Sequence, residues 1–144
     1  RFAVNRLRLP LVLGTGLCYR GAAAVLMDLI RAAHPGASHT FNFHNEAIDL
    51  MEVRDAAAAV LRTLQHPGPL AATYNINGFT ARPLEIVDAL RARVANFEVE
   101  LLDQTPQYLF PLVDDSRFRR DTGFIPTTDL QRLLAQLLDE GVKP

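Results

Sequence analysis

Few of the side chains that commonly carry chemistry are grouped in this 144-residue sequence. Cys18 follows a glycine-containing turn and has no histidine near it, so a base that would activate a cysteine nucleophile is missing there. The four histidines are scattered, without the spacing of a zinc site, and one cysteine cannot form an internal disulfide. The sequence therefore predicts neither a metal centre nor a catalytic cysteine.

The remaining candidates suit binding better than catalysis. His39 and His44 flank a short predicted strand, and each is either a contact to a small-molecule substrate or an ordinary loop histidine. Arg82 directly precedes a predicted helix, where it either meets an anion or is simply solvated. Asp55 lies in the first turn of another predicted helix, and we expect it to stabilise that helix end through the macrodipole and hydrogen bonding.

Composition excludes several function classes. The chain is 49% hydrophobic and 22% charged, which is typical of a globular domain. Its formal net charge of -1 gives no broad basic field for nucleic acid, and the short basic run at 117–120 is typical of a solvated face. No apolar run approaches the roughly 18 residues that span a bilayer, and the first segment lacks a signal-peptide cleavage site. The sequence predicts a soluble cytoplasmic domain that binds neither nucleic acid nor membranes.

Strands and helices are predicted to alternate along the chain. In the segment Phe2 to Leu13 the apolar residues alternate at first and become nearly continuous from Leu7, which is typical of a strand buried on both faces of a parallel sheet, and Pro10 should loosen it. Helical spacing predicts helices at Gly21–Ala33, Arg54–Gln65, from Pro83 onward, Ser116–Asp121 and Thr128–Glu140. Short or alternating apolar runs predict strands around Phe41–Phe43, Ile48–Leu50, Thr73–Asn77 and Phe97–Leu101.

The predicted helices each carry an apolar face that should be buried. In the helix over 54–65 this face consists of Ala57, Val60, Leu61 and Leu64. In the helix from Pro83 it consists of Ile86, Val87, Leu90 and Val94. The resulting order of elements favours an α/β or α+β class over an all-helical bundle.

Several short stretches, in this order, resemble the C-terminal part of the extended short-chain dehydrogenase/reductase family, the NAD(P)-dependent epimerase/dehydratase group. They are LRLPLVLGTG at 7–16, DLMEVRDAA at 49–57, YNING at 74–78, PLEI at 83–86, DDSR at 114–117 and GFIP at 123–126. Asn77 stands where the family usually has a glycine. The resemblance implies a Rossmann-type protein whose opening strand and TYNIN segment (73–77) join a parallel sheet.

Two family motifs are missing from this sequence. Gly14-Thr15-Gly16 follows a strand, but Tyr19 stands where the glycine-rich cofactor loop would need another glycine. No tyrosine is followed four residues later by a lysine, as in the family's catalytic Tyr-x-x-x-Lys. We therefore expect residues 1–144 to be the substrate-side C-terminal portion of a longer protein, with no catalytic residue of its own and its dinucleotide-binding portion absent.

By resemblance, Pro10 and Leu11 lie at the nicotinamide end of the cleft, and Leu11 also contacts substrate. Relatives that use nucleotide sugars often carry arginines at the positions of Ile48 and within 104–108, and this sequence has none there. The lack of these arginines weakens the prediction of a nucleotide-sugar substrate. A smaller ketone, aldehyde or free sugar is then a comparably suitable substrate.

The predicted function is therefore the substrate-binding half of an NAD- or NADP-dependent oxidoreductase, epimerase or dehydratase that works by hydride transfer. Its partners would be a small-molecule substrate and its own N-terminal half, with a possible homodimer formed mainly through that half. Two alternatives remain open. One is a non-catalytic sensor or regulator of the same fold that binds NAD(P). The other is an independent small domain that dimerises through its exposed strand.

Overall fold

The protein is described from a computed structural model, which defines residues 4–17, 21–102 and 110–140. Cys18 and the 104–108 segment lie outside the described residues. The elements are β1 (Arg6–Arg8), β2 (Leu11–Leu13), α1 (Ala22–Ala32), β3 (Ser38–Asn42), β4 (Ile48–Glu52), α2 (Val53–Leu64), β5 (Thr73–Asn75), β6 (Phe79–Ala81), α3 (Pro83–Arg93), β7 (Glu98–Leu102), α4 (Ser116–Thr122) and α5 (Leu130–Asp139). Among the described residues, no helix is long and apolar enough to cross a membrane.

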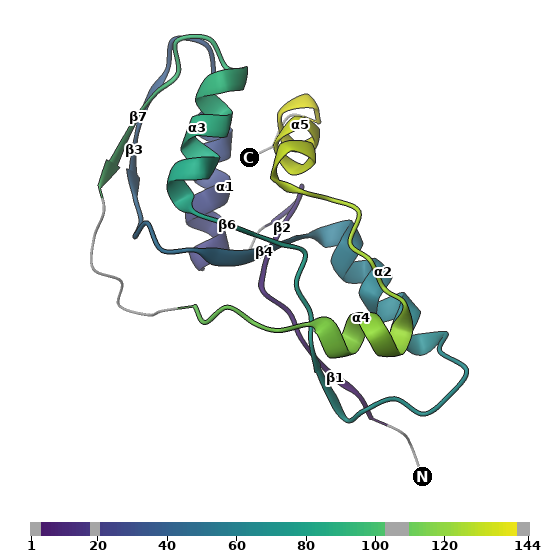
Figure 1. Cartoon of the computed structure of the whole chain (residues 1–144). Helices are drawn as coiled ribbons and strands as arrows, with labels where there is room; N and C mark the ends of the chain where they lie inside the picture. The colour runs from purple at the N-terminus through teal and green to yellow at the C-terminus, as the bar shows by residue number, and fades with distance from the viewer. Residues whose placement is uncertain (1–3, 18–20, 103–109, 141–144) are drawn as a thin grey trace.

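The described strands form three small sheets. β1 is parallel to β5, β3 is parallel to β7, and β4 lies between β2, parallel to it, and β6, antiparallel to it. In Figure 1 the β3–β7 sheet with α1, α3 and α5 forms the upper part of the molecule, and β1, β5, α2 and α4 form the lower part. The β2–β4–β6 sheet lies between them. The predicted α/β class is confirmed.

The opening segment is broken in two at Leu9 and Pro10, which lie in neither strand. Proline cannot donate to a sheet ladder, so the predicted loosening at Pro10 is confirmed. The prediction of one strand buried on both faces is wrong for this chain, because β1 and β2 belong to different sheets and Arg6 and Arg8 are exposed. Within the described residues, β1 and β5 have only each other as sheet partners, so each strand has an open edge.

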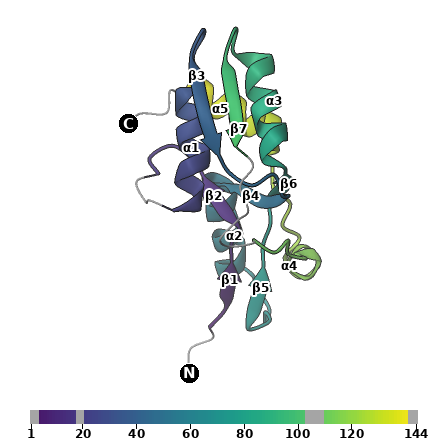
Figure 2. The same cartoon turned by 90° about the vertical axis from the view of Figure 1, so that its left-hand side faces the viewer.

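The larger hydrophobic core includes side chains of α1, α3, α5 and the β3–β7 sheet. Figure 2 shows the three helices behind that sheet. Ile86, Val87, Leu90 and Val94 of the α3 region are all buried, as the periodicity predicts. In α5 the buried residues are Leu133, Leu134 and Leu137. Here local spacing was sufficient because the apolar residues of each helix meet a core within this chain.

Helix α2 begins one residue before its predicted start, but its predicted apolar face is wrong. Val60, Leu61 and Leu64 are exposed, whereas the buried residues are Asp55, Ala56 and Ala59. The small alanines allow α2 to approach a second core made by Met51, Ala56, Ala59, Tyr74, Ile76, Phe118 and Phe124. The larger apolar side chains of α2 are therefore directed away from both cores of this chain.

Strand β6 was not predicted. Its position is explained by the turn at Gly78, directly before β6, which approaches β4 closely. The Gly78 N–H donates to the Leu50 carbonyl at 3.2 Å. A Cβ atom at residue 78 would lie 2.6 Å from the Leu50 carbonyl oxygen, so only glycine fits here. Gly78 thus allows the chain to turn from β5 into β6 directly against β4.

Candidate functional site

A pocket of about 270 Å³ lies beside the break between β1 and β2. Its lining residues are Leu9, Pro10, Leu11, Asp49, Phe110, Pro111 and Val113. The structure therefore brings the two residues predicted at the nicotinamide end of the cleft, Pro10 and Leu11, to one pocket. Asp49 is the ionisable residue among these lining residues, and the rest of the lining is apolar.

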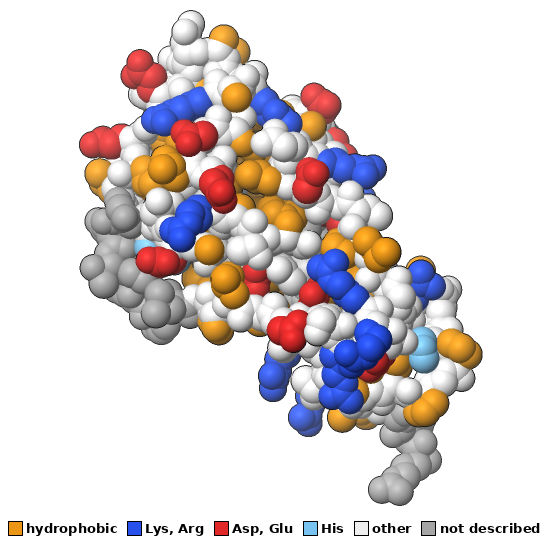
Figure 3. All heavy atoms as spheres, in the orientation of Figure 1, with side chains coloured by type: hydrophobic (Ala, Val, Ile, Leu, Met, Phe, Trp, Pro, Cys, Tyr) orange, Lys and Arg blue, Asp and Glu red, His pale blue; other side chains and the backbone are white. Residues whose placement is uncertain are grey.

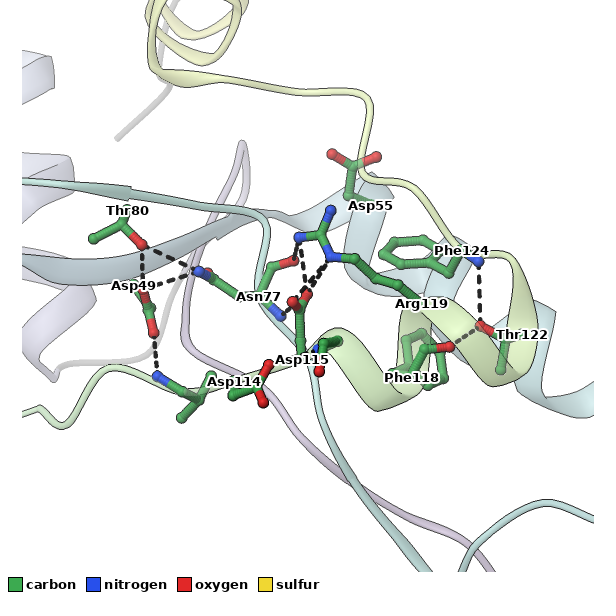
Figure 4. Close-up of polar contacts among 12 residues, drawn as sticks. Asp49, Asp55, Asn77, Thr80, Asp114, Asp115, Phe118, Arg119, Thr122 and Phe124 are labelled. Carbon is green, nitrogen blue, oxygen red and sulfur yellow. Dashed lines mark hydrogen bonds and ion pairs between the residues drawn. The ribbon is translucent and has the colours of Figure 1, made fainter.

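Asp49 is a buried carboxylate that joins three segments of the chain (Figure 4). Its Oδ1 accepts hydrogen bonds from the Asn77 side-chain amide at 2.9 Å and the Thr80 hydroxyl at 2.5 Å. Its Oδ2 accepts from the Val113 N–H at 2.7 Å. Hydrogen bonds to an ionised acceptor are stronger than those between neutral groups, so Asp49 holds the 113 segment against β4 and β6.

Asn77 connects this carboxylate to α4. Its backbone N–H donates to the Asp115 carboxylate at 3.1 Å, and its carbonyl accepts from Arg119 at 3.3 Å. Arg119 also donates through Nε to both carboxylate oxygens of Asp115, at 2.9 and 2.8 Å. The Asn77 side-chain oxygen is buried without a hydrogen-bond partner. Sequence reasoning missed this network, although the substitution of the family's glycine by Asn77 was a usable signal.

The basic run of α4 is only partly the solvated face that its sequence predicts. The side chains of Arg117 and Arg120 are well exposed, and both lie near the Asp121 carboxylate. Arg119, by contrast, is held by Asp115. Figure 3 shows acidic and basic side chains interspersed over the upper part of the face that it draws, and mainly basic side chains over the lower part.

Asp55 lies in the first turn of α2, as its position predicts, but its carboxylate also binds outside the helix. The N-cap of α2 is Glu52, whose carboxylate accepts from the Arg54 N–H at 2.6 Å and the Asp55 N–H at 3.3 Å. The Asp55 carboxylate is buried and accepts instead from the N–H and hydroxyl of Thr127 and from the Thr128 N–H at 2.9 Å. Asp55 therefore fixes the segment between α4 and α5 to α2.

The two candidate histidines occupy different surroundings. His39 lies in β3 and lines a separate hollow of about 500 Å³ on the β3–β7 sheet. His44 is buried and stacks on Phe43 with ring centroids 4.7 Å apart. Its Nδ1 accepts from the Glu46 N–H at 3.2 Å, and its buried Nε2 has no hydrogen-bond partner. Neither histidine lines the pocket at Pro10 and Leu11.

Arg82 lies at the N-cap of α3 and is exposed. Its backbone N–H donates to the Glu85 carboxylate at 2.6 Å, which satisfies one donor at the helix start. Its guanidinium donates to the Asn45 carbonyl at 3.0 Å, and the Asn45 side chain accepts from the Leu84 N–H at 3.0 Å. Arg82 thus connects α3 to the loop between β3 and β4.

A nicotinamide ring fits the chemistry of the Pro10 pocket, whereas a phosphate group does not. The described lining contains no lysine or arginine. Its apolar walls suit the faces of a neutral ring.

Solved structures with the same fold are dehydrogenases and related enzymes. The chain matches a partial-consensus L-threonine 3-dehydrogenase with a TM-score of 0.79 and 25% identity, over 95% of this chain and 48% of that one. It matches the GalE-like L-threonine dehydrogenase of Cupriavidus necator, in its apo form, with a TM-score of 0.78 and 25% identity, over 95% of this chain and 53% of that one. RMD from Pseudomonas aeruginosa complexed with NADPH matches with a TM-score of 0.79 and 20% identity, over 97% of this chain and 48% of that one.

The chain spans about half the length of these solved structures. No protein-family model matches it. The structural matches confirm the resemblance that the sequence motifs indicated, because the matched proteins are extended short-chain dehydrogenases.

Proposed function

We propose that this chain, which has the fold of the C-terminal half of an extended short-chain dehydrogenase, is the substrate-side half of an NAD(P)-dependent oxidoreductase. The observation that carries the proposal is the pocket at the β1–β2 break, where Pro10 and Leu11 meet Asp49 and the 110–113 segment. In this proposal the pocket receives the reacting part of a small hydroxyl or carbonyl compound. The reaction would be a dehydrogenation, reduction, epimerisation or dehydration.

The proposal assigns cofactor binding mainly to a dinucleotide-binding half outside residues 1–144. It is supported by the length of the matched structures, about twice that of this chain, and by the lack of the glycine-rich loop and Tyr-x-x-x-Lys in this sequence. Residues 1–144 alone would then be inactive. When bound, NAD or NADP would supply the hydride acceptor or donor.

This chain's own residues would shape the pocket and exclude water from it. Pro10 and Leu11 would contact the nicotinamide, and Leu11 would also contact substrate. An apolar, water-poor pocket favours hydride transfer because it strengthens electrostatic interactions and limits side reactions. Asp49 acts as a positioning residue here, since its bond to the Val113 N–H holds one wall of the pocket in place.

The lining favours a small substrate over a nucleotide sugar. A pyrophosphate is best held by guanidinium groups, and the described lining provides none. His39 would not contact this substrate, because it lines a different hollow. His44 and Arg82 remain predicted contacts only if substrate extends toward the loop that Asn45 occupies between β3 and β4.

A fusion protein tests the proposal. The N-terminal half of the Cupriavidus necator L-threonine dehydrogenase would be joined ahead of residue 1, and formation of reduced nicotinamide would be followed with L-threonine and other small hydroxy compounds. Leu9→Trp should narrow the pocket and abolish most turnover. Leu9 is 42% exposed, so the fold should accept a larger side chain there. Leu84→Trp is the matched control, at 40% exposure on α3.

Two outcomes would count against the proposal, one against the activity and one against the pocket. If the fusion binds NAD(H) but oxidises and reduces none of the compounds, the non-catalytic sensor of the same fold is favoured. If it turns over and Leu9→Trp changes the rate no more than Leu84→Trp does, the pocket at Pro10 and Leu11 is not the substrate site. Homodimer formation and cytoplasmic location remain predictions.

A further inference from the structure

The turn between β5 and β6 contains an asparagine followed by a glycine, Asn77-Gly78, and this is the only such pair in the sequence. Glycine has no side chain to shield its backbone nitrogen from the side chain of the residue before it. That nitrogen can attack Cγ of the asparagine, which is one reason why asparagine is a thermolabile residue. Whether Asn77 reacts in this way therefore depends on how the fold holds both residues.

Both reacting groups of the pair are held by hydrogen bonds, and Figure 4 shows those of Asn77. The Asn77 side-chain nitrogen, which would leave as ammonia, donates to Asp49 Oδ1 at 2.9 Å and to the Thr80 hydroxyl at 3.2 Å. The Gly78 N–H, whose nitrogen would attack, donates to the Leu50 carbonyl at 3.2 Å. Attack requires both groups to give up these partners, so the hydrogen bonds oppose the reaction.

The backbone of the pair is fixed as well. The Asn77 N–H donates to the Asp115 carboxylate at 3.1 Å, and the Asn77 carbonyl accepts from Arg119 at 3.3 Å. A Cβ atom at residue 78 would lie 2.6 Å from the Leu50 carbonyl oxygen. A ring that joins residues 77 and 78 would therefore form in a turn that has little space on its β4 side.

We propose that Asn77-Gly78 is a site of spontaneous deamidation, which is protected in the folded chain and is modified when the contacts of Asn77 open. The Gly78 nitrogen forms a bond to Asn77 Cγ, the bond from Cγ to Nδ2 breaks, and ammonia leaves with the proton of the Gly78 N–H. Water then opens the cyclic imide at either carbonyl. One opening gives aspartate, and the other gives isoaspartate, in which the main chain continues through Cγ.

The aspartate product would weaken the network around Asp49. The Asn77 amide donates to Asp49 Oδ1, and in the product a second carboxylate would take its place. Neighbouring carboxylates repel each other when both are ionised, and Asp49 would also lose a donor. Because Asp49 holds the Val113 N–H at 2.7 Å, the disturbance should reach the wall of the pocket at Pro10 and Leu11.

The isoaspartate product would also disturb the main chain. It adds one carbon atom to the backbone between residues 77 and 78, where the turn already lies too close to Leu50 for a Cβ atom. The extra atom should therefore displace β6 from β4. Neither product reverts to asparagine in water, so each opening of this turn carries a chance of permanent damage to the pocket wall, whatever the pocket binds.

Mass spectrometry of the 144-residue chain tests the site. The chain would be incubated in mildly alkaline buffer, with and without denaturing urea, and peptides would be analysed for deamidation and isoaspartate. In urea, Asn77 should be the first asparagine modified, and Asn96, which precedes the bulky Phe97, should react much more slowly. In the folded chain the rate at Asn77 should be lower by about tenfold or more, because modification is limited to transient opening.

Thr80→Val tests the side-chain contacts. Valine has nearly the shape of threonine but lacks the hydroxyl that contacts both Asn77 and Asp49. The rate at Asn77 in the folded chain should rise about fivefold, as expected for the loss of one hydrogen bond of ordinary strength, and the rate in urea should not change. Thr73→Val in β5 is the matched control, because the Thr73 hydroxyl makes no hydrogen bond among the described residues. It should leave both rates unchanged.

Asn77→Asp tests the consequence of the modification. The variant should unfold at a lower urea concentration than the wild type, whereas Asn96→Asp, at an exposed position, should unfold at nearly the same concentration. An unchanged midpoint for Asn77→Asp would show that deamidation does not damage the fold.

Three further results would overturn the proposal. They are equal rates at Asn77 in the folded and unfolded chains, no modification of Asn77 in urea, and an unchanged folded-state rate in Thr80→Val. None of these measurements involves turnover, so the proposed oxidoreductase activity and the deamidation site can each fail without the other.

Discussion

Two buried carboxylates, Asp49 and Asp55, come from neighbouring positions in β4 and α2 and both bind backbone N–H groups far along the chain. Asp49 reaches Val113, and Asp55 reaches Thr127 and Thr128. Among the residues that the structure describes, each accepts from neutral donors and fixes a loop without forming an ion pair. At the scale of single residues, these aspartates determine where the C-terminal third of the chain lies.

Asp55→Ala should destabilise the folded chain strongly. The substitution leaves the donors of Thr127 and Thr128 without their acceptor, and the cost of losing hydrogen bonds to a charged group is about 2–4 kcal/mol in total. Urea denaturation followed by circular dichroism measures the change. Asp88→Ala, which removes an exposed ion pair with Arg91, is the control and should cost less than about 0.5 kcal/mol. Equal costs for the two variants would show that Asp55 does not hold the segment.

Asp114 should titrate below the ordinary range of an aspartate. Hydrogen bonds from the Ser116 backbone N–H and from its hydroxyl lower the pKa of this exposed carboxyl. A lowered pKa means that Asp114 contributes stability at pH values above its unfolded pKa, and that this contribution is lost as pH falls through its folded pKa. Ser116→Ala keeps the N–H and removes the hydroxyl, so the pKa should rise only part of the way in an NMR titration. An unchanged pKa would exclude the hydroxyl as a cause.

Among the elements, α4 depends on one aromatic side chain for its position. Phe118 is fully buried, packs edge-on against Tyr74 of β5 at 5.3 Å between ring centroids, and contacts Phe124 at 5.5 Å. The Tyr74 hydroxyl also donates to the Asp121 carboxylate at 2.9 Å. These contacts attach α4 to β5. The contact between Asp115 and Asn77 depends on this attachment.

Phe118→Ala should therefore cost about 3–5 kcal/mol, the usual range for removing a buried phenylalanine. Thermal unfolding would measure the loss. The control is Ile125→Ala in the following loop, where the side chain is mostly exposed and the change should be small. If both variants unfold at the wild-type temperature, α4 is not held by this contact.

The sequence was sufficient for elements whose packing follows from their own periodicity. The buried faces of α3 and α5 could be predicted because the apolar residues recur at helical spacing and meet a core within this chain. The buried face of α2 could not be predicted in this way. An apolar stripe indicates that a helix packs against a partner, but it does not show whether the same chain contains that partner. Strand β6 was missed because it is three residues long and is set by the close approach of Gly78 to β4.

The candidate site could be predicted only in part, because some of its contacts join positions that are far apart in sequence. Pro10 and Leu11 could be placed from the motif around the opening strand, and they do line one pocket. The roles of Thr80, Asp115 and Arg119 could not be predicted, because their contacts join positions that are far apart in sequence. Of the residues in this network, Asn77 was the one that the sequence analysis marked as a departure from the family pattern.

At the scale of the whole molecule, two cores of unequal size divide the chain. The core under α1, α3 and α5 includes many more buried side chains than the core between α2, β5 and α4. Regions with fewer buried apolar contacts open at lower free energy. In the 144-residue chain we therefore expect backbone amides of β5 and α4 to exchange hydrogen faster than those of α1 and α3, measured by mass spectrometry. Equal protection of the two groups would show one cooperative unit.

The hydrogen bonds of Asp49 to residues much later in the sequence determine when this part of the fold can form during synthesis. Asp49 leaves the ribosome before Asn77 and Thr80, and well before Val113, which supplies the last of its hydrogen bonds. Until Val113 emerges, Oδ2 of this carboxylate must remain hydrated, because burying it without its donor is costly. The wall of the pocket that contains Val113 is therefore completed only after β4, β6 and α3 have been translated.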